Sequence, residues 1–323
     1  MRLLVTGGAG FIGSNFIRMI NRGELAGVTH VTALDKLTYA GLRENLEQVS
    51  GSSSFIFQHG DICNPELVAS LVSEVDAVVN FAAESHVDRS ISGAADFIQA
   101  NIVGVQVLLD AIKASGRAIR FLQISTDEVY GSIETGSWTE ESPLQPNSPY
   151  SASKAGGELL SRSYHSTHKL DVVITRCSNN YGTHHFPEKL IPLFITNLLE
   201  GRKVPIYGTG KNVRDWLHVD DHCRGIFNVL MNGQSGQVYN IGGGRELTNM
   251  EITNLLLEAM GADESSIEYV EERKGHDFRY SMDWSKINKE LGYAPRVNFE
   301  DGIRDTIQWY RDNHAWWKPL KNR

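Results

Sequence analysis

Short apolar runs alternate with helical patterns along the first half of the chain. Six runs have the length and composition of buried strands, at Leu3–Thr6, Val31–Leu34, Phe55–Gln58, Ala77–Phe81, Arg120–Ile124 and Asp171–Thr175. Helical patterns lie between them, for example at Phe11–Asn21, Asn64–Ser73 and Asp96–Ser115. Strands that alternate with helices at this spacing are joined by right-handed crossovers into a parallel sheet with helices on both faces. The pattern therefore predicts an α/β protein with a doubly wound, Rossmann-type parallel sheet.

The pattern changes after about residue 176, where Gly, Pro and Asn become frequent. The strands become short (Val204–Tyr207 and Gln237–Asn240), and the helices Asp220–Met231 and Asn249–Met260 lie between long loops. We predict a dinucleotide-binding domain over residues 1–176, to which later segments can return. We further predict a smaller mixed lobe over residues 177–323, which covers the carboxyl ends of the sheet strands and binds the substrate.

Composition and charge narrow the class of protein. The chain has 323 residues, of which 41% are hydrophobic and 22% charged, and no run approaches the roughly 18 uninterrupted apolar residues that would suggest a membrane span. Its N-terminus lacks the pattern of a signal peptide, so we expect a cytoplasmic protein that does not bind membranes. A net charge of −8 argues against nucleic-acid binding. The odd, widely spaced Cys63, Cys177 and Cys223 indicate neither a disulfide framework nor a metal site.

A glycine-rich loop joins the first strand to the first helix. Gly7, Gly10 and Gly13 permit a tight turn, close approach to a pyrophosphate and packing of the helix on the strand. The helix N-terminus then faces the negative charge. About twenty residues further on, Asp35 ends the second strand, where it can accept both ribose hydroxyls and repel a 2′-phosphate. NAD is therefore favoured over NADP, although the neighbouring Lys36 weakens this preference slightly.

Two strand ends add candidate contacts to the cofactor. Asp61 and Ile62, after the third strand, are placed to bracket the adenine. Ala82 and Ala83, after the fourth strand, offer small side chains near the phosphates and the ribose. Ordinary packing at a strand end would explain each pair equally well.

Tyr150 and Lys154 begin a long helical pattern and share one face of it, because they are four residues apart. A free tyrosine has a pKa of about 10, too high for a base at neutral pH. The lysine cation and a positively charged nicotinamide would both lower this pKa. With Thr126 at the end of the fifth strand, the pair predicts an oxidoreductase-type active site.

The glycine loop, Thr126 and the Tyr150/Lys154 pair together resemble the extended short-chain dehydrogenases/reductases over essentially the whole chain. Five further stretches resemble the dTDP-glucose 4,6-dehydratase family, namely Ala83–Ser90, Ser125–Gly131, Asn179–Gly182, Pro187–Pro192 and Lys274–Asp277. This resemblance implies an NAD-dependent hydro-lyase that oxidises C4 of a nucleotide sugar, eliminates water across C5 and C6, and returns the hydride to C6.

The resemblance also implies roles for two adjacent acids, with Glu128 as the base at C5 and Asp127 as the acid at C6. Asp127 can donate a proton at neutral pH only if its pKa is raised, which burial beside Glu128 would achieve. Adjacent side chains of an extended strand point to opposite faces. Both acids can therefore face one sugar only if residues 126–130 leave the strand in a turn.

The family likeness supplies the remaining candidate residues. For the cofactor they are Gly7, Gly10, Phe11, Ile12, Gly13, Asp35, Lys36, Thr38, Asp61, Ile62, Ala82, Ala83, Tyr150, Lys154 and Cys177. For the substrate they are His86, Thr126, Asn179, Asn180, Glu188, Lys189, Arg214, Asn249, Arg273, His276 and Tyr280. Taken alone, Arg214 would more simply form a salt bridge with Asp215 or Asp220, and Lys189 would lie on a solvated face.

A symmetric homodimer is the default assembly for such a chain. The resemblance implies that the helix at Asp96–Ser115 and the helix that starts at Tyr150 pack against their symmetry mates as a four-helix bundle. The second helix contains the small residues Ala152, Ala155, Gly156 and Gly157, which permit close approach.

Other functions fit parts of this pattern. A nucleotide-sugar 4-epimerase or a UDP-glucuronate decarboxylase uses the Thr-Tyr-Lys set but needs no acidic pair at residues 127 and 128. A non-catalytic NAD-binding regulator would be expected to lose Tyr150 or Lys154, and both are present. Thymidine and uridine differ by one methyl group, worth only about 1–3 kcal/mol, and no residue in the sequence identifies which base is bound.

Overall fold

The computed structural model describes residues 1–273 and 275–322. Its largest element is a seven-stranded sheet of order β10-β6-β5-β4-β1-β2-β3, in which every neighbouring pair is parallel. The strands are β1 (Arg2–Thr6), β2 (His30–Asp35), β3 (Phe55–His59), β4 (Ala77–Asn80), β5 (Arg120–Thr126), β6 (Val172–Cys177) and β10 (Val238–Ile241). The predicted doubly wound fold is confirmed, and all six predicted strands of the first half are present.

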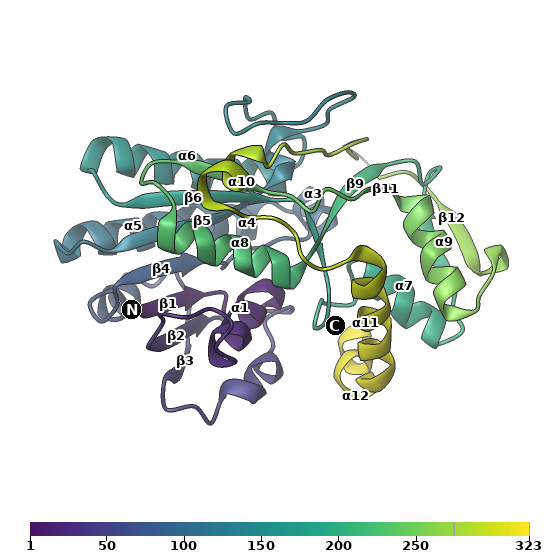
Figure 1. The fold of residues 1–323 in the computed structure, drawn as a ribbon, viewed down its shortest axis with the longest axis horizontal. Helices are drawn as coiled ribbons and strands as arrows, with labels where there is room; N and C mark the ends of the chain where they lie inside the picture. Colours follow the sequence, from purple (N-terminus) through teal and green to yellow (C-terminus); the bar gives the residue numbers. More distant parts are fainter. Residues whose placement is uncertain (274, 323) are drawn as a thin grey trace.

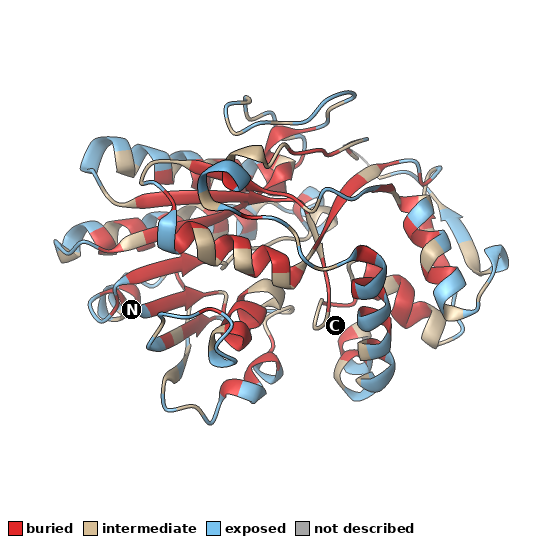
Figure 2. Cartoon of the chain, in the orientation of Figure 1, coloured by how far each residue is buried: buried red, intermediate tan, exposed pale blue. Residues whose placement is uncertain are grey.

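Helices cover both faces of this sheet (Figure 1). One face packs against α1 (Phe11–Asn21) and α8 (Val219–Asn232), and the other against α2 (Pro65–Val72), α5 (Gly104–Ser115) and α6 (Pro149–His168). Along β1, Leu3 and Val5 belong to one hydrophobic cluster and Leu4 to the other, because successive side chains of a strand point to opposite faces. The strands are consequently buried along most of their length, except the edge strand β3, which is only partly buried (Figure 2).

The helix predicted at Asp96–Ser115 contains a π-helical segment. It consists of α4 (Ala95–Ile98), the π turn η2 (Gln99–Val103) and α5. Within this turn the side chain of Asn101 bonds both backbone groups of Glu84 and donates to the hydroxyl of Ser153. The turn therefore connects the loop after β4 with α6. The short helix α3 (Val87–Ser92) follows this loop in the chain.

The smaller lobe is built from two short sheets and several helices. Its strands are β7 (Asn179–Tyr181), β9 (Val213–His218) and β11 (Glu246–Thr248) in a mixed sheet, and β8 (Val204–Tyr207) with β12 (Ile267–Val270) in a parallel pair. Its helices are α7 (Leu190–Leu199), α9 (Asn249–Met260), α11 (Phe299–Asp312) and α12 (His314–Trp317). The remaining elements are η1 (Arg43–Val49), η3 (Asp127–Tyr130), η4 (Glu264–Ser266), α10 (Ser285–Leu291) and η5 (Lys318–Asn322).

Two segments beyond residue 176 lie in the large unit rather than in the smaller lobe. The edge strand β10 pairs with β6, and α8 packs on the core that includes α1. Both segments carry the alternating or helical apolar pattern of the first half, but their partners in the sheet are distant in sequence. The division at residue 176 therefore marks only the first crossing of the chain between the two units.

A buried ion pair lies behind the sheet, between Arg176 of β6 and Glu158 of α6, and both side chains are fully buried. Arg176 Nε donates to Glu158 Oε2 at 3.0 Å, and the guanidinium lies over the ring of Tyr130, 4.6 Å from its centroid. Breaking such a pair leaves an uncompensated charge in the interior.

We predict that Glu158→Gln lowers the free energy of unfolding by about 3 kcal/mol, because the guanidinium keeps its charge and loses its counter-charge. Asp171→Asn is the matched control, since Asp171 pairs with Arg120 at 2.9 Å but is 37% exposed, and should cost less than about 1 kcal/mol. Urea-induced unfolding measures both, and equal losses for the two variants would contradict the prediction.

Candidate active site

A cavity of about 930 Å³ opens at the carboxyl ends of the large sheet, where the smaller lobe covers them. This is the expected position of a ligand in an open α/β sheet, since strand order reverses between β1 and β4. Every catalytic, cofactor and substrate residue named from the sequence lines this cavity. The structure thus brings the whole candidate set together, while the individual roles of its members stay predictions.

The glycine loop has the close packing that the sequence predicts. Gly7 has a φ of +64°, and a Cβ atom there would lie 2.6 Å from the backbone nitrogen of Ala82. A Cβ atom at Gly13 would lie 2.4 Å from the carbonyl oxygen of Gly7. Side chains are therefore excluded at both positions, and the loop and the N-terminus of α1 form a cradle that fits a pyrophosphate.

The end of β2 provides a carboxylate beside this cradle. Asp35 accepts hydrogen bonds from the backbone nitrogens of Ala9 (2.9 Å) and Leu37 (2.8 Å). A carboxylate has about four acceptor sites, so the two hydroxyls of a ribose can still be bound. The ammonium of Lys36 lies 2.7 Å from a carboxylate oxygen of Asp61. Because Asp61 neutralises Lys36, this lysine does not offset the repulsion of a 2′-phosphate by Asp35.

The catalytic turn solves the geometric problem of two adjacent acids. Strand β5 ends at Thr126, and Asp127–Tyr130 form the 3₁₀ turn η3. The hydroxyl of Thr126 accepts a hydrogen bond from the backbone nitrogen of Glu128 at 3.3 Å and caps this turn. Since the chain leaves the extended conformation at Asp127, both Asp127 and Glu128 line the cavity.

Burial sets the protonation of the two acids. The pKa of Asp127 is raised well above its ordinary value, first by burial and then by the charge of Glu128. Burial also raises the pKa of Glu128, while the cations Arg214 and Lys189 oppose the rise. One oxygen of Asp127 is buried and makes no hydrogen bond with the described residues. Both pKa values are thus raised, and the cations oppose the rise at Glu128, which is the kind of difference that the predicted roles of acid and base require.

The phenol of Tyr150 behaves differently from the sequence-based prediction. Burial raises its pKa well above the ordinary value, and the charge of Glu128 adds to the rise. The ammonium of Lys154 donates to the carbonyl oxygen of Ile124 at 2.6 Å, and burial lowers its pKa to about 8. In the chain without its cofactor, burial therefore determines the direction of the shift, and the lowering of this pKa by Lys154 and a positively charged nicotinamide stays a prediction for the site with NAD bound.

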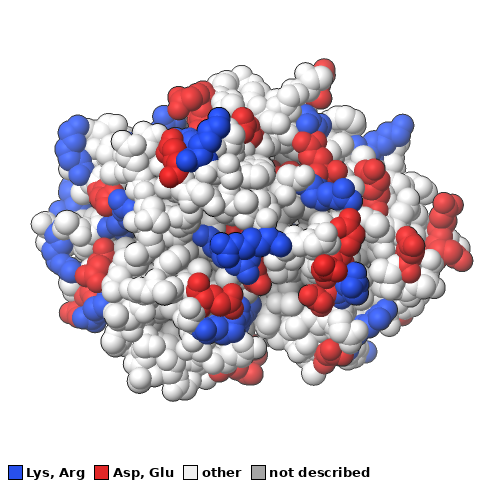
Figure 3. Space-filling model, viewed as in Figure 1, with Lys and Arg blue, Asp and Glu red and all other residues white. Residues whose placement is uncertain are grey.

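Cations line the part of the cavity farther from the glycine loop. The guanidinium of Arg214 lies over the ring of Tyr280, 4.2 Å from its centroid, and donates to the carbonyl oxygen of Asp277 at 2.9 Å. Lys189 donates to the carbonyl oxygen of Ser85 at 2.9 Å and is held inside the cavity. The outer face in Figure 3 carries interspersed acidic and basic side chains, so positive charge for an anionic ligand comes from the cavity wall.

The simpler alternatives, a salt bridge for Arg214 and a solvated position for Lys189, are therefore incorrect. Among the described residues Arg214 forms no ion pair with Asp215 or Asp220. Asp215 instead accepts from the backbone nitrogens of Gly243 and Arg245. Lys189 does not lie on a solvated face, and burial lowers its pKa.

His86 and Glu188 link the two units across the cavity. The Nδ1 atom of His86 accepts from the backbone nitrogen of Arg89, so Nε2 carries the proton and lies 3.4 Å from Glu188. Burial lowers the pKa of His86 to about 4, which keeps it neutral. Glu188 also accepts from the hydroxyl of Tyr39 at 2.9 Å. Other candidates are paired nearby: Arg273 with Asp88, His276 with Glu272, and Asn180 with His222.

The structure adds cavity residues that the sequence did not indicate. They include Tyr39, His185, Phe186, Pro205 and Tyr207. Tyr207 ends β8, a strand that the apolar pattern predicted, but the pattern does not show which strand end faces a ligand. Lys274, part of one family stretch, lies outside the described residues.

A doubly wound sheet with a glycine loop and with Thr126, Tyr150 and Lys154 in one cavity defines an extended short-chain dehydrogenase/reductase. Within this class the chain belongs to the GDP-mannose 4,6 dehydratase family, whose family model matches residues 4–306.

Known relatives agree with this assignment. A dTDP-glucose 4,6-dehydratase of an Actinoplanes strain is 58% identical over 320 residues, which cover 98% of this chain and 100% of that relative. The crystal structure of the dTDP-glucose 4,6-dehydratase of Streptomyces venezuelae with NAD bound has a TM-score of 0.98 at 57% identity, covering 99% of this chain and 100% of that one. A UDP-glucose 4-epimerase of Thermotoga maritima has a TM-score of 0.88 at 30% identity, with coverages of 97% and 100%.

The raised pKa of Asp127 predicts a pH-dependent loss of stability. A carboxyl group whose pKa is higher in the folded chain keeps its proton where the unfolded chain has lost it, so the free energy of unfolding falls as pH rises through that range. We predict that Asp127→Asn makes this fall less steep and stabilises the ligand-free protein at neutral pH by about 1 kcal/mol.

Urea-induced unfolding at about pH 5 and about pH 8 measures this effect. The exposed Asp305 supplies the control, because Asp305→Asn should leave the pH dependence unchanged. A fall in stability that is equally steep in Asp127→Asn and in the unmodified protein would show that Asp127 is ionised in the folded chain.

Proposed function

We propose that this protein is a dTDP-glucose 4,6-dehydratase that uses bound NAD and converts dTDP-glucose to dTDP-4-keto-6-deoxyglucose. The observation that carries this proposal is the placement of Asp127 and Glu128 on one turn, in the same cavity as Tyr150 and Lys154. Relatives with this activity at 56–58% identity over essentially the whole chain support it.

Each catalytic side chain has a defined task in this reaction. Tyr150, with Thr126 beside it, takes the proton of the C4 hydroxyl once the positive charges of the bound nicotinamide and of Lys154 have lowered the pKa of the phenol. NAD, when bound, accepts the hydride from C4 and returns it to C6. Glu128 removes the proton from C5, which the C4 ketone has made acidic, and Asp127 protonates the departing C6 hydroxyl as water. Glu128 returns a proton to C5 as the hydride reaches C6, and the proton that Tyr150 took from the C4 hydroxyl balances the one that Asp127 gave up. Carbon, hydrogen and electrons balance, because water is the only species lost.

The cavity supports a division between the two ligands. The glycine loop, Asp35, Lys36, Thr38, Asp61, Ile62, Ala82, Ala83 and Cys177 are proposed to hold the cofactor. Across from them, the proposed sugar-nucleotide contacts are His86, Asn179, Asn180, Glu188, Lys189, Arg214, Asn249, Arg273, His276 and Tyr280. Arg214 and Lys189 supply positive charge inside an acidic protein, as a pyrophosphate requires.

The alternative functions explain less of the cavity. An epimerase or a decarboxylase shares the fold and the Thr-Tyr-Lys set, and fold alone does not separate these activities. Neither reaction needs a carboxylic acid next to a carboxylate base, and two adjacent carboxyl groups with raised pKa values, at Asp127 and Glu128, support a reaction that needs both. A binding protein without catalysis has no use for Tyr150 and Lys154 in the cavity.

The test of the function is incubation of the pure protein with dTDP-glucose deuterated at C4, without added NAD. The expected product has lost one water and carries the deuterium at C6, as mass spectrometry would show. Glu128→Gln should lower the rate of water loss by about 100- to 10,000-fold, because the base at C5 is gone while the groups that oxidise C4 remain.

The other outcomes each point to a different protein. An unchanged mass with formation of the galactose isomer would identify an epimerase and overturn the proposal. No turnover of dTDP-, UDP- or GDP-sugars, even with NAD added, would favour a binding protein.

We also propose a cytoplasmic homodimer, formed through the face that residues 95–115 share with α6. By length and composition the run 95–115 is apolar enough to cross a membrane, but its α5 part packs on α2 and α6, as a core helix does. Gly157 is used inside the chain, since a Cβ there would lie 2.2 Å from the carbonyl oxygen of Asn101. Ile98 and Leu159 are 49% and 53% exposed, and a second subunit would cover them.

We predict that Leu159→Lys converts the dimer to a monomer, because it places a charge in the proposed contact. Ile56→Lys is the control, since Ile56 is similarly exposed (56%) on the edge strand β3. Light scattering coupled to size-exclusion chromatography measures the mass, and a dimer that survives Leu159→Lys would place the interface elsewhere.

A further inference from the structure

An aromatic cluster at the end of the chain lies against the loop that follows β7. Trp309 and Trp316, from α11 and α12, contact the ring of His184, with centroid separations of 4.3 and 5.7 Å. Trp309 and Trp316 also contact each other at 5.0 Å. Packing within the smaller lobe would explain the cluster if it contacted only that lobe. Two chains of contacts, however, connect the cluster to the glycine loop.

The first connection runs through Asn45. The indole nitrogen of Trp316 donates to Asn45 Oδ1 at 3.1 Å, across 271 positions of sequence. Asn45 Nδ2 in turn donates to the carbonyl oxygen of Ala9 at 2.9 Å, inside the glycine loop. Asn45 is only 2% exposed, so water does not readily replace either bond. Trp316 therefore orients the amide that holds the middle of the loop.

The second connection runs through His185, which follows His184 in the chain. Its ring stacks on Phe11 with a centroid separation of 4.1 Å and an interplanar angle of 11°. The hydroxyl of Tyr310 donates to the carbonyl oxygen of His185. Phe11 is the first residue of α1 and lines the cavity. The C-terminal residues thus contact the glycine loop from its two flanks.

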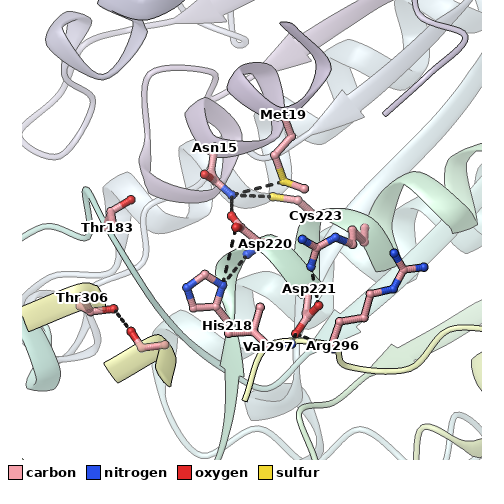
Figure 4. A network of polar contacts seen from close by, with 12 residues as sticks. Asn15, Met19, Thr183, His218, Asp220, Asp221, Cys223, Arg296, Val297 and Thr306 are labelled. Atoms are coloured by element: carbon pink, nitrogen blue, oxygen red, sulfur yellow. Dashed lines mark hydrogen bonds and ion pairs between the residues drawn. The ribbon is translucent and has the colours of Figure 1, made fainter. Parts of the chain in front are cut away.

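The body of α1 is held separately. Asn15 donates to Asp220 at 2.8 Å and lies beside Cys223, which ties α1 to the start of α8 (Figure 4). Because α1 is fixed by this contact, the glycine loop that precedes it is the part that can still move. Leu42, which donates to the carbonyl oxygen of Ala9, packs in a cluster with Phe186 and Leu320, so the segment after β2 is held by the C-terminus as well.

We infer that the C-terminal aromatic cluster, acting through Trp316 and Asn45, is a positioning element that keeps the cofactor loop closed and so retains the dinucleotide between turnovers. This inference rests on the proposed NAD-dependent function. The glycine loop and the segment after β2 both line the cavity beside the proposed cofactor, and both are tied to the C-terminal residues. Trp316 touches neither reacting atom nor ligand-lining surface, and acts through Asn45.

The test compares Trp316→Phe with the unmodified protein. Phenylalanine keeps an aromatic ring in the cluster but removes the donor to Asn45. Trp309→Phe is the matched control, because the indole nitrogen of Trp309 makes no hydrogen bond within the described part of the chain. The measurement is the dissociation rate of bound NADH, followed by its fluorescence after mixing with excess NAD, together with the NAD content of the purified protein.

Trp316→Phe is expected to speed NADH release about tenfold, with the rate for Trp309→Phe near that of the unmodified protein. Activity of Trp316→Phe without added NAD should fall with time, and saturating NAD should restore kcat. Asn45→Ala should also speed release, and the double variant should be no faster than Asn45→Ala alone, because both residues act through one connection.

Unchanged NADH release in Trp316→Phe and Asn45→Ala would overturn the inference. Faster release in Trp309→Phe to the same extent would do so too, because the effect would then come from general packing. If the unmodified protein bound no dinucleotide at all, the proposed function itself would fail, and this would be seen before any variant was compared.

Discussion

Burial of two adjacent carboxyl groups at the end of β5 is the constraint around which the cavity is arranged. The large unit supplies Asp127 and Glu128 on a single turn, and removal from water raises the pKa of both. The opposing cations come from the smaller lobe, with Arg214 on β9 and Lys189 at the start of α7. The cations that oppose the rise in pKa therefore reach the two carboxyl groups only when the smaller lobe covers the sheet, so the electrostatics of this turn depend on both units.

Much of the fold follows from local patterns. The glycine loop, the six strands of the first half and the Tyr150/Lys154 pair are signals that lie within a few residues of each other, and the structure has them in the predicted places. The turn at Asp127 could not be predicted from the sequence pattern, because an acidic pair after a strand is compatible with either an extended or a turned chain. It was only required if both acids were to face one sugar. Contacts such as that of Trp316 with Asn45 leave no local signal, since their partners meet only when the chain is folded.

The same limit applies to the pKa of Tyr150 in the chain without its cofactor. A lysine four residues away on a helix suggests attraction between two charges, but a sequence does not state how completely both groups lose water. In the folded chain Lys154 bonds a backbone carbonyl, and the phenol shares its surroundings with Glu128 and Cys177. Helical spacing predicted the neighbours correctly, while desolvation, which depends on every surrounding element, determined the direction of the pKa shift.

The repeated passage of the chain between the two units has a mechanical consequence. The chain crosses between the two units several times. It enters the smaller lobe at β7, leaves it for α8 in the large unit, and returns to it after β10. A body attached at one point can rotate about a hinge, whereas a body attached at several separated points cannot rotate without bending all of them. Motion of the smaller lobe as one body therefore requires all of these connections to bend together, whereas displacement of a single surface segment at the mouth of the cavity requires none of them to bend.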